Sequence, residues 1–340
     1  MSRGKTTPFL DERGRPLPGS ISEKAFIDVN GARQGLFIKG RSDRNPVLLW
    51  LHGGIPDTFL TARYPTGLED LFTVVWWEQR GSGISFDPNI PPESMTLDQF
   101  IADTLTVTNY LRDRFGKDRI YLMAHSGGSF VGIQAVAQSP EQFAAYIGVA
   151  QMSNQLRSEK LAYDYMLEEF KKRGDRARVR KLESAPVTLS EGTPRAYLAL
   201  RDPGMHRLGI GTMHDMRSIV TGLIWPSLTY SEYTLAEKVN LWRAKMAAGP
   251  SLLWAEMLAT DMADKVAALS VPAYFLHGIY DYTCAYAEAR TYFANLEAPT
   301  KAFYTFEHSS HSPMFEEPAK TRQILRQDVL TGRTSLADVT

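Results

Sequence analysis

The sequence predicts an α/β fold, in which a mostly parallel, twisted sheet is flanked by helices and carries an inserted helical segment. Apolar runs of strand length recur along the chain, at residues 47–51, 72–77, 119–124, 143–150, 271–276 and 301–306. Helical patterns lie between several of these runs, as expected where crossover helices join parallel strands. From residue 151 to 264 the alternation stops, and the composition favours helices.

The N-terminal part is predicted to begin with a hairpin and then to enter the parallel sheet. Residues 25–29 and 35–39 flank Asn30-Gly31, a turn pair typical of antiparallel hairpins. After the next two strands, residues 96–99 resemble a capping box, and a helical pattern continues from there to about residue 114.

A serine stands at the turn between a predicted strand and a predicted helix. The apolar run 119–123 ends just before Ala124-His125-Ser126-Gly127-Gly128, and residues 129–138 read as a helix. Such a turn holds a serine hydroxyl clear of the backbone, beside a helix N-terminus that favours developing negative charge. The usual pattern is Gly-x-Ser-x-Gly, and Ala124 replaces the first glycine. Ser126 is therefore the candidate nucleophile, with an ordinary turn serine as the alternative interpretation.

An acid and a histidine follow two later strands. Asp281 comes just after the strand predicted at 271–276, and His311 lies on the loop after the strand predicted at 301–306. A serine needs a base to take its proton, and the base needs a third group to hold its tautomer. The chain order of Ser126, Asp281 and His311 is the order found in α/β-hydrolases.

Each partner has a competitor. His308 lies on the same loop as His311, and Asp281 follows a glycine, where aspartate also forms ordinary turns. We favour His311 because it begins a His-x-Pro pattern followed by an acidic first turn. We favour Asp281 as the acid because it lies at a strand's carboxyl end, where open α/β sheets gather their chemistry.

Two further segments carry a family resemblance. Residues 52–56 are His-Gly-Gly-Ile-Pro, and residues 78–83 are Glu-Gln-Arg-Gly-Ser-Gly. With the serine turn, they resemble the α/β-hydrolase superfamily and, within it, the proline iminopeptidases, serine peptidases that remove an N-terminal proline. That family has His-Gly-Gly-Pro-Gly and Asp-Gln-Arg-Gly-x-Gly at these places. Here the proline falls one position later, and glutamate replaces aspartate.

The glycine segment is the candidate source of an oxyanion hole. Glycines after a buried strand let the backbone approach the reacting carbonyl, so one N–H from this segment and the N–H of Gly127 are expected to bind the oxyanion. We assign these donors to Gly54 and Gly127, with Ile55 as the alternative to Gly54. Glu78 and Arg80 are expected to brace the neighbouring loop.

The resemblance implies that the helical segment is a cap over the site. Its aromatic residues are candidates for the roof of an apolar pocket, although they could instead form the cap's own core: Trp225, Tyr230, Tyr233, Trp242 and Trp254. Proline iminopeptidases receive the substrate's imino group with cap carboxylates, and those available here are Glu232, Glu237 and Glu256. Trp225, Trp254 and Glu256 are the predicted substrate-binding residues.

Composition excludes several other classes of function. The 340 residues carry 38 Lys and Arg against 38 Asp and Glu, so no basic excess points to nucleic acid or to an anionic membrane. The N-terminus has no apolar stretch, which predicts a cytoplasmic protein. The single cysteine, Cys284, excludes an internal disulfide, and no metal-ligand spacing is evident, so no cofactor and no metal are expected. The oligomeric state stays open.

The sequence thus predicts an α/β-hydrolase core at residues 1–150 and 265–340 with a helical cap at 151–264. The expected function is hydrolysis through an acyl-enzyme, first as a proline iminopeptidase-like aminopeptidase acting on a short peptide. An esterase, lactonase or small-amide hydrolase is the alternative. A binding protein or a cofactor-free lyase on the same scaffold is a second alternative, because one scaffold can host different functions.

Overall fold

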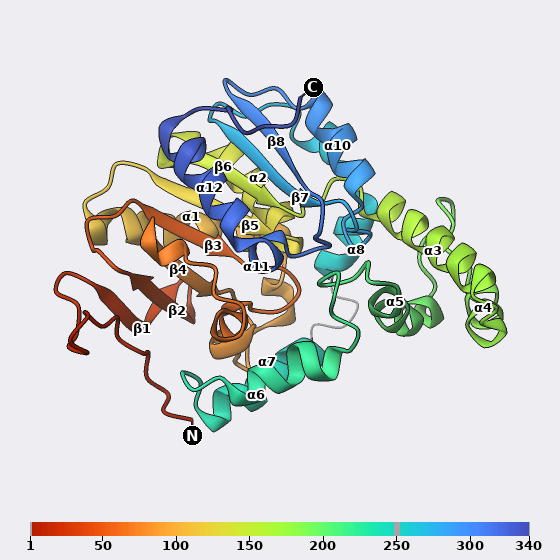
Figure 1. Ribbon diagram of the computed structural model, residues 1–340, viewed down its shortest axis with the longest axis horizontal. Coiled ribbons are helices and arrows are strands. Elements are labelled where there is room, and N and C mark those ends of the chain that lie inside the picture. The colour runs from red at the N-terminus through yellow and green to blue at the C-terminus, as the bar shows by residue number, and fades with distance from the viewer. Residues whose placement is uncertain (1, 248–251, 340) are drawn as a thin grey trace.

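The structure is a computed structural model that describes residues 2–247 and 252–339. Across these residues the strands form one eight-stranded sheet in the order β1-β2-β4-β3-β5-β6-β7-β8 (Figure 1). The strands are β1 (Ile21–Val29), β2 (Ala32–Gly40), β3 (Val47–Leu51), β4 (Thr73–Glu78), β5 (Ile120–His125), β6 (Phe143–Val149), β7 (Ala273–Gly278) and β8 (Lys301–Phe306).

β2 is the one strand of this sheet that runs opposite to the others. β1 pairs with β2 and β2 with β4 in antiparallel fashion, and all pairs from β4 to β8 are parallel. The carboxyl ends of β3, β5, β7 and β8 therefore meet at one edge of the sheet. The segments that directly follow β3, β5, β7 and β8 contain all the residues predicted to act in catalysis.

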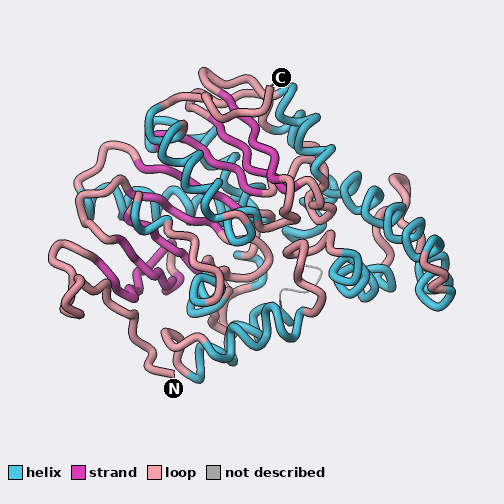
Figure 2. Tube along the Cα trace, in the orientation of Figure 1, coloured by secondary structure: helices cyan, strands magenta, loops and turns pink. Residues whose placement is uncertain are grey.

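Helices cover both faces of the sheet (Figure 2). On one face lie α1 (Leu97–Phe115), α2 (Gly127–Gln138) and α10 (Tyr286–Asn295), and on the other lie α11 (Pro313–Glu316) and α12 (Pro318–Gln327). Successive strand residues point to opposite faces, so Leu49 and Leu51 join the first core while Leu48 and Trp50 join the second. Because both faces are covered, β3 is a continuous apolar run rather than an alternating one.

Between β6 and β7, the described residues form helices and no strand. They are α3 (Gln155–Lys172), α4 (Arg176–Glu183), α5 (Arg195–Leu208), a π-helical turn η6 (Val220–Ile224), α6 (Trp225–Thr229), α7 (Leu235–Ala247), α8 (Leu252–Ala259) and α9 (Met262–Lys265). The helices α3, α4 and α5 share an apolar cluster of their own and project to one side of the sheet (Figure 1).

The predicted elements are confirmed, with shifts at their ends. β8 has the predicted bounds, whereas β1 begins at Ile21, four residues before the prediction. The early part of β1 includes Glu23 and Lys24, so it lacks the apolar pattern by which a buried strand is recognised. β5 extends to His125, which places the residue before Ser126 inside the sheet.

Arg80 is buried in a polar network beneath the β1–β2 hairpin. Its Nε and Nη2 donate to the two carboxylate oxygens of Asp103 at 2.7 and 2.9 Å. Asn30 and Gln34 donate to the same carboxylate at 2.8 and 2.7 Å. Arg80 braces this region as expected, but its partner is Asp103 on α1, and the carboxylate of Glu78 is bound elsewhere.

Replacing Arg80 with methionine is expected to lower the free energy of unfolding by about 3–5 kcal/mol, because it leaves a buried carboxylate without its cation. Arg41→Met provides the matched control. The ion pair of Arg41 with Asp70 has side chains about half exposed, at 50% and 45%, and is expected to contribute about 0–1 kcal/mol. Urea unfolding of both variants measures the difference, and equal losses would contradict the assigned role of Arg80.

Candidate active site

Ser126 occupies a strained backbone conformation between β5 and α2. Its φ of 56° and ψ of −128° fall in a region that non-glycine residues rarely adopt. The conformation is held from both sides, because the Ser126 N–H donates to the carbonyl of Val149 at 3.0 Å and its carbonyl accepts the N–H of Ser129 at 2.8 Å. Strain of this kind costs about 1–3 kcal/mol and persists where the surroundings enforce it.

Glycines on both sides allow close packing around Ser126. A Cβ on Gly53 would lie 2.6 Å from the Cβ of Ser126, so only glycine lets the loop after β3 pass the candidate nucleophile. A Cβ on Gly128 would lie 2.5 Å from the carbonyl oxygen of His52. The last glycine of the predicted pattern is therefore required for α2 to pack against the end of β3.

Asp281 is buried and accepts hydrogen bonds on both carboxylate oxygens. Its Oδ2 accepts from His311 Nδ1 at 2.9 Å and faces His277 Nε2 at 3.1 Å. Its Oδ1 accepts the N–H groups of Thr283 at 2.8 Å and Cys284 at 3.1 Å. Burial raises the pKa of Asp281, but the positive charge of His311 and these hydrogen bonds outweigh it, so the net pKa is well below its usual range. Asp281 is therefore ionised at neutral pH, and its hydrogen bonds hold the carboxylate in one position.

His311 has the electrostatic surroundings of a neutral base. Burial is the largest influence and lowers the pKa of His311, the charge and hydrogen bond of Asp281 oppose it, and His125 and His277 reinforce the lowering. Because Nδ1 donates to Asp281, the lone pair of the neutral ring is on Nε2. A pKa below the usual value keeps the ring able to accept a proton at neutral pH.

The two loop histidines differ in their surroundings. His308 is exposed, and its backbone N–H is bound by Glu317 at 3.1 Å. His311 is buried against Asp281. The acidic turn that follows has a structural purpose, since Glu316 accepts the N–H groups of Ser310 at 3.0 Å and Ser312 at 3.4 Å, on either side of His311. Burial raises the pKa of Glu316 to about 7.

A second histidine–aspartate pair connects the loops of the candidate nucleophile and base. His125 Nε2 donates to the backbone carbonyl of His311 at 2.8 Å, and Nδ1 faces Asp57 Oδ2 at 3.2 Å. Trp50 Nε1 donates to the same carboxylate oxygen at 3.2 Å. Burial disfavours the charged form of His125, but the hydrogen bond and charge of Asp57 outweigh it and raise its pKa. Its ring centroid lies 4.8 Å from that of His311.

Replacing His125 with glutamine is expected to move the acid limb of the kcat/KM profile to higher pH. The charge of His125 lowers the pKa of His311, so its removal raises that pKa, and the base is then protonated at a higher pH. A pH profile of the variant from about 5 to 8 measures this shift. A fall in rate with an unchanged acid limb would show that His125 acts on packing alone.

The candidate oxyanion donors lie at the start of α2 and in the loop after β3. Gly127 is the first residue of α2, so its N–H is free of intrahelical bonding. A Cβ on Gly127 would lie 3.9 Å from Gly53 Cα, which brings the loop after β3 alongside the helix start. Gly54 is exposed in this loop. The choice between Gly54 and Ile55 as second donor stays a prediction.

A family model described as the alpha/beta hydrolase fold matches residues 46–318. The chain belongs to this α/β-hydrolase fold family. The probable aminopeptidase YbaC of Bacillus subtilis (strain 168) is 31% identical over 308 residues, which cover 89% of this chain and 95% of the relative. The α/β-hydrolase resemblance inferred from the sequence is thereby confirmed, and the protein is an enzyme of the hydrolase class.

Solved structures show the same fold at low identity. A proline iminopeptidase from Mycobacterium smegmatis aligns with a TM-score of 0.63 at 15% identity, covering 91% of this chain and 98% of that chain. Est816, described as an N-acyl homoserine lactone degrading enzyme, aligns with a TM-score of 0.58 at 14% identity. The alignment covers 89% of this chain and 100% of that chain. The fold is thus shared by enzymes described with different substrates.

The three predicted substrate-binding residues of the α/β-hydrolase have different surroundings. Trp225, on α6, is 63% exposed. Trp254, on α8, is partly buried and packs against the core cluster that contains the α2 residues. Glu256 is exposed on the same helix. Met257 follows it, and its Cε would lie 3.3 Å from a Cβ on Gly127, so α8 passes directly beside the start of α2.

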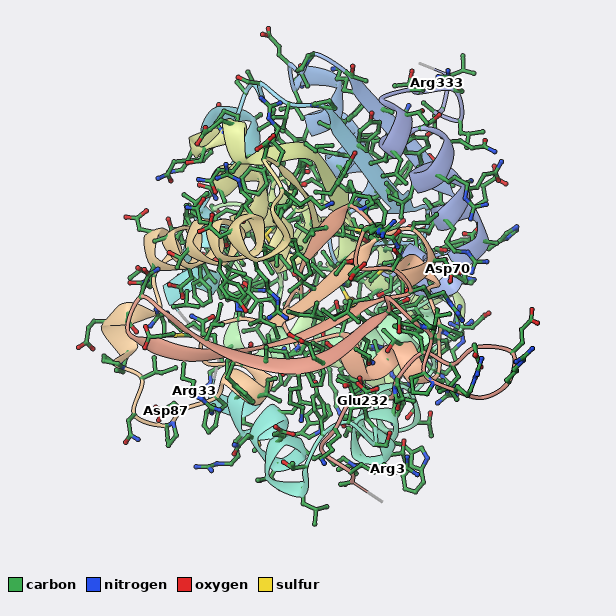
Figure 3. All side chains as sticks on the ribbon, turned by 90° about the vertical axis from the view of Figure 1, so that its left-hand side faces the viewer. Arg3, Arg33, Asp70, Asp87, Glu232 and Arg333 are labelled. Carbon is green, nitrogen blue, oxygen red and sulfur yellow. The ribbon has the colours of Figure 1, made fainter. Side chains whose placement is uncertain are left out.

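Two of the three predicted cap carboxylates form ion pairs with the N-terminal hairpin. Glu232 lies on the side of the molecule that carries β1 and β2 and binds Lys39 Nζ at 2.7 Å (Figure 3). Glu237 binds Lys24 Nζ at 2.9 Å. Both carboxylates anchor the helical segment to the sheet, which leaves Glu256 as the exposed carboxylate of the predicted set.

Two of the predicted roof aromatics are buried against the sheet. Tyr230 and Tyr233 pack edge-to-face on Phe37 of β2, with ring centroids at 6.4 and 5.8 Å. The hydroxyl of Tyr233 donates to Glu78, and burial raises the pKa of that carboxyl to about 7. These two rings therefore belong to the core of the sheet, and neither the roof of a pocket nor a separate core of the helical segment accounts for them.

Sequence reasoning missed a buried ion pair that connects α3 and α5 to the loop of Asp281. Arg201 Nε on α5 donates to both carboxylate oxygens of Glu159 on α3, at 2.8 and 2.7 Å. Tyr197 donates to the same carboxylate at 3.0 Å. Gln155 Nε2 donates to Glu159 at 2.7 Å and to the carbonyl of Thr283 at 2.8 Å. Glu159 is therefore neutralised by a neighbouring guanidinium.

Cys284 is buried between Asp281 and this polar cluster. Burial raises the pKa of its thiol well above the ordinary value, the charge of Asp281 adds to the rise, and Arg201 and the Ser126 hydroxyl oppose it. The thiol is thus protonated at neutral pH and close to the candidate nucleophile.

Within residues 2–247 and 252–339, no group of three or more His, Cys, Asp or Glu side chains is arranged to hold a metal ion. None of the helices in these ranges is long and apolar enough to cross a membrane.

Proposed function

We propose that this α/β-hydrolase is a serine hydrolase in which Ser126, His311 and Asp281 form the catalytic triad. His311 Nε2 takes the proton of Ser126 as Oγ attacks the substrate carbonyl, and Asp281 holds the imidazole and stabilises the imidazolium. The N–H groups of Gly127 and Gly54 stabilise the oxyanion of the tetrahedral intermediate. His311 then gives its proton to the leaving amine or alcohol.

Deacylation repeats these steps with water as the nucleophile and Ser126 as the leaving group. Water attacks the acyl-enzyme as His311 takes its proton, and collapse of the second tetrahedral intermediate returns the proton to Ser126 and releases the acid. The observation that carries the proposal is the hydrogen bond of 2.9 Å between His311 Nδ1 and Asp281, at the sheet edge where Ser126 is held at a positive φ.

The substrate we propose first is a short peptide with an N-terminal proline. The support is the 31% identity with a relative named as a probable aminopeptidase, together with the sequence resemblance to proline iminopeptidases. We propose that residues 151–264 form the cap and that α8, which carries Trp254 and Glu256, contacts the substrate. The position of Met257 beside Gly127 supports this role for α8.

Hydrolysis of L-prolyl-p-nitroanilide tests this substrate, with the Ser126→Ala variant as the blank. Turnover by the wild type that disappears in the variant is the expected result. Absence of turnover by the wild type, with retained hydrolysis of p-nitrophenyl butyrate, would reject the peptidase function and keep the serine hydrolase.

A specific observation favours the second candidate, hydrolysis of an ester, lactone or small amide without a terminal amine. An aminopeptidase needs a carboxylate for the substrate's cationic nitrogen, and Glu159, Glu232 and Glu237 already have cationic partners, so that Glu256 alone of the glutamates considered for this role is left. The comparison of prolyl-p-nitroanilide with p-nitrophenyl butyrate separates the two candidates, because only the first substrate carries an amine.

A further inference from the structure

Lys245, on α7, lies beside the glycine loop that follows β3. Its Nζ is 3.3 Å from the position that a Cβ would take on Gly54. This places an ammonium next to one of the two proposed oxyanion donors. A cation so close to the reacting carbonyl interacts with whatever charge the substrate carries there.

The ammonium of Lys245 has no direct partner among the residues that the structure describes. It forms neither a hydrogen bond nor an ion pair with them, although Asp202 is near enough to act on its charge. The nearby guanidinium of Arg201 is different, because it is bound to Glu159 and, at 2.7 Å, to Asp202 Oδ1. Of these two cations, Lys245 is the one free to bind an incoming anion.

The surroundings of Lys245 differ from those of an ordinary surface lysine. The side chain as a whole is exposed to solvent, but the protein atoms packed around it lower the pKa of its ammonium. Asp202 opposes this lowering and Arg201 adds to it. An extended surface lysine keeps its charged group fully in water. The surroundings of Lys245 therefore disfavour its charged form, and an anion bound beside the ammonium favours that form again.

We propose that Lys245 is a specificity residue that binds a carboxylate carried by the substrate close to the scissile carbonyl. The inference rests on the proposed roles of Ser126 and Gly54. The carboxylate can belong to either half of the substrate. In a dipeptide it is the C-terminal carboxylate of the leaving group, and in a dicarboxylic monoester it is the distal carboxylate of the acyl group.

Two matched substrate pairs test the proposal and distinguish these sources. Pro-Ala and prolyl-alaninamide differ only in the leaving-group carboxylate. Mono-p-nitrophenyl glutarate and p-nitrophenyl valerate have acyl chains of equal length and differ only in the distal carboxylate. In at least one pair, the wild type is expected to show a higher kcat/KM for the carboxylate, and Lys245→Met is expected to reduce that preference about 10- to 100-fold, as for loss of a hydrogen bond to a charged group.

Two further variants complete the experiment. Lys245→Arg keeps the cation and is expected to retain part of the preference. Arg243→Met removes an exposed cation of the same helix, which lies over the ring of Phe86, and is expected to leave the preference unchanged. Equal preference in the wild type and Lys245→Met, or a wild-type preference for the neutral member of both pairs, would overturn the role of Lys245 alone. Hydrolysis of none of the four substrates would overturn the proposed function and this inference together.

Discussion

Replacement of Ser126 with alanine is expected to lower kcat/KM by about 10⁵-fold or more, because loss of the nucleophile removes the covalent route. Alanine keeps the Cβ of serine, so the backbone strain at φ of 56° is the same in both proteins. The fold is therefore expected to survive, with a thermal midpoint within a few degrees of the wild type. Steady-state kinetics on the best ester or amide substrate gives the rate, and circular dichroism gives the midpoint.

The size of the loss discriminates between mechanisms. A folded Ser126→Ala protein that keeps more than a hundredth of the wild-type rate would require another nucleophile or direct attack by water. The thiol of Cys284 is the nearest alternative, but burial raises its pKa, and the protonated thiol is a poor nucleophile.

Replacement of His311 with glutamine is expected to lower kcat/KM by about 10⁴- to 10⁶-fold. Glutamine can still donate a hydrogen bond to Asp281, so the buried carboxylate keeps a partner while the proton acceptor is lost. His308→Gln is the matched control on the same loop. Because His308 is exposed, its replacement is expected to change kcat/KM less than about threefold, as for most surface substitutions.

Both histidine variants are to be compared by kcat/KM at several pH values. Equal losses at the two positions would contradict the choice of His311 as base. A loss confined to His308 would move the base to the exposed end of the loop and leave the Asp281–His311 hydrogen bond as a structural contact.

The core of the fold could be predicted because its signals are local. Six apolar runs mark the six parallel strands, and loops that follow parallel strands meet at one edge of the sheet. This rule alone groups Ser126, Asp281 and His311. Ser126 lies 155 positions before Asp281, and Asp281 lies 30 positions before His311. The structure adds the distance and the hydrogen bond between the last two.

The histidines that surround the candidate triad were not predicted, although their positions at strand ends can be recognised in the sequence. His125 and His277 lie at or next to the carboxyl ends of β5 and β7, so the same rule places them at the active edge. Their individual partners could not be predicted. The contact of His125 with Asp57 joins residues 68 positions apart in the sequence and depends on how two loops pack.

The helical segment was the least predictable part. Its helices follow from composition, but which face each helix presents depends on packing against the sheet. Glu232 and Glu237 are ordinary glutamates in the sequence, and only the fold shows that Lys39 and Lys24 bind them. Nothing in the sequence around Lys245 indicates that its ammonium lies beside Gly54.

The central claim is that Ser126 is an activated nucleophile, and covalent labelling tests it most directly. The purified protein is treated with a fluorophosphonate, digested, and mapped by mass spectrometry, with Ser126→Ala and His311→Gln treated in parallel. The account predicts one adduct, on the peptide containing Ser126, that is absent from the first variant and strongly reduced in the second. Labelling at another residue, or a wild type that stays unlabelled while fully folded, would contradict it.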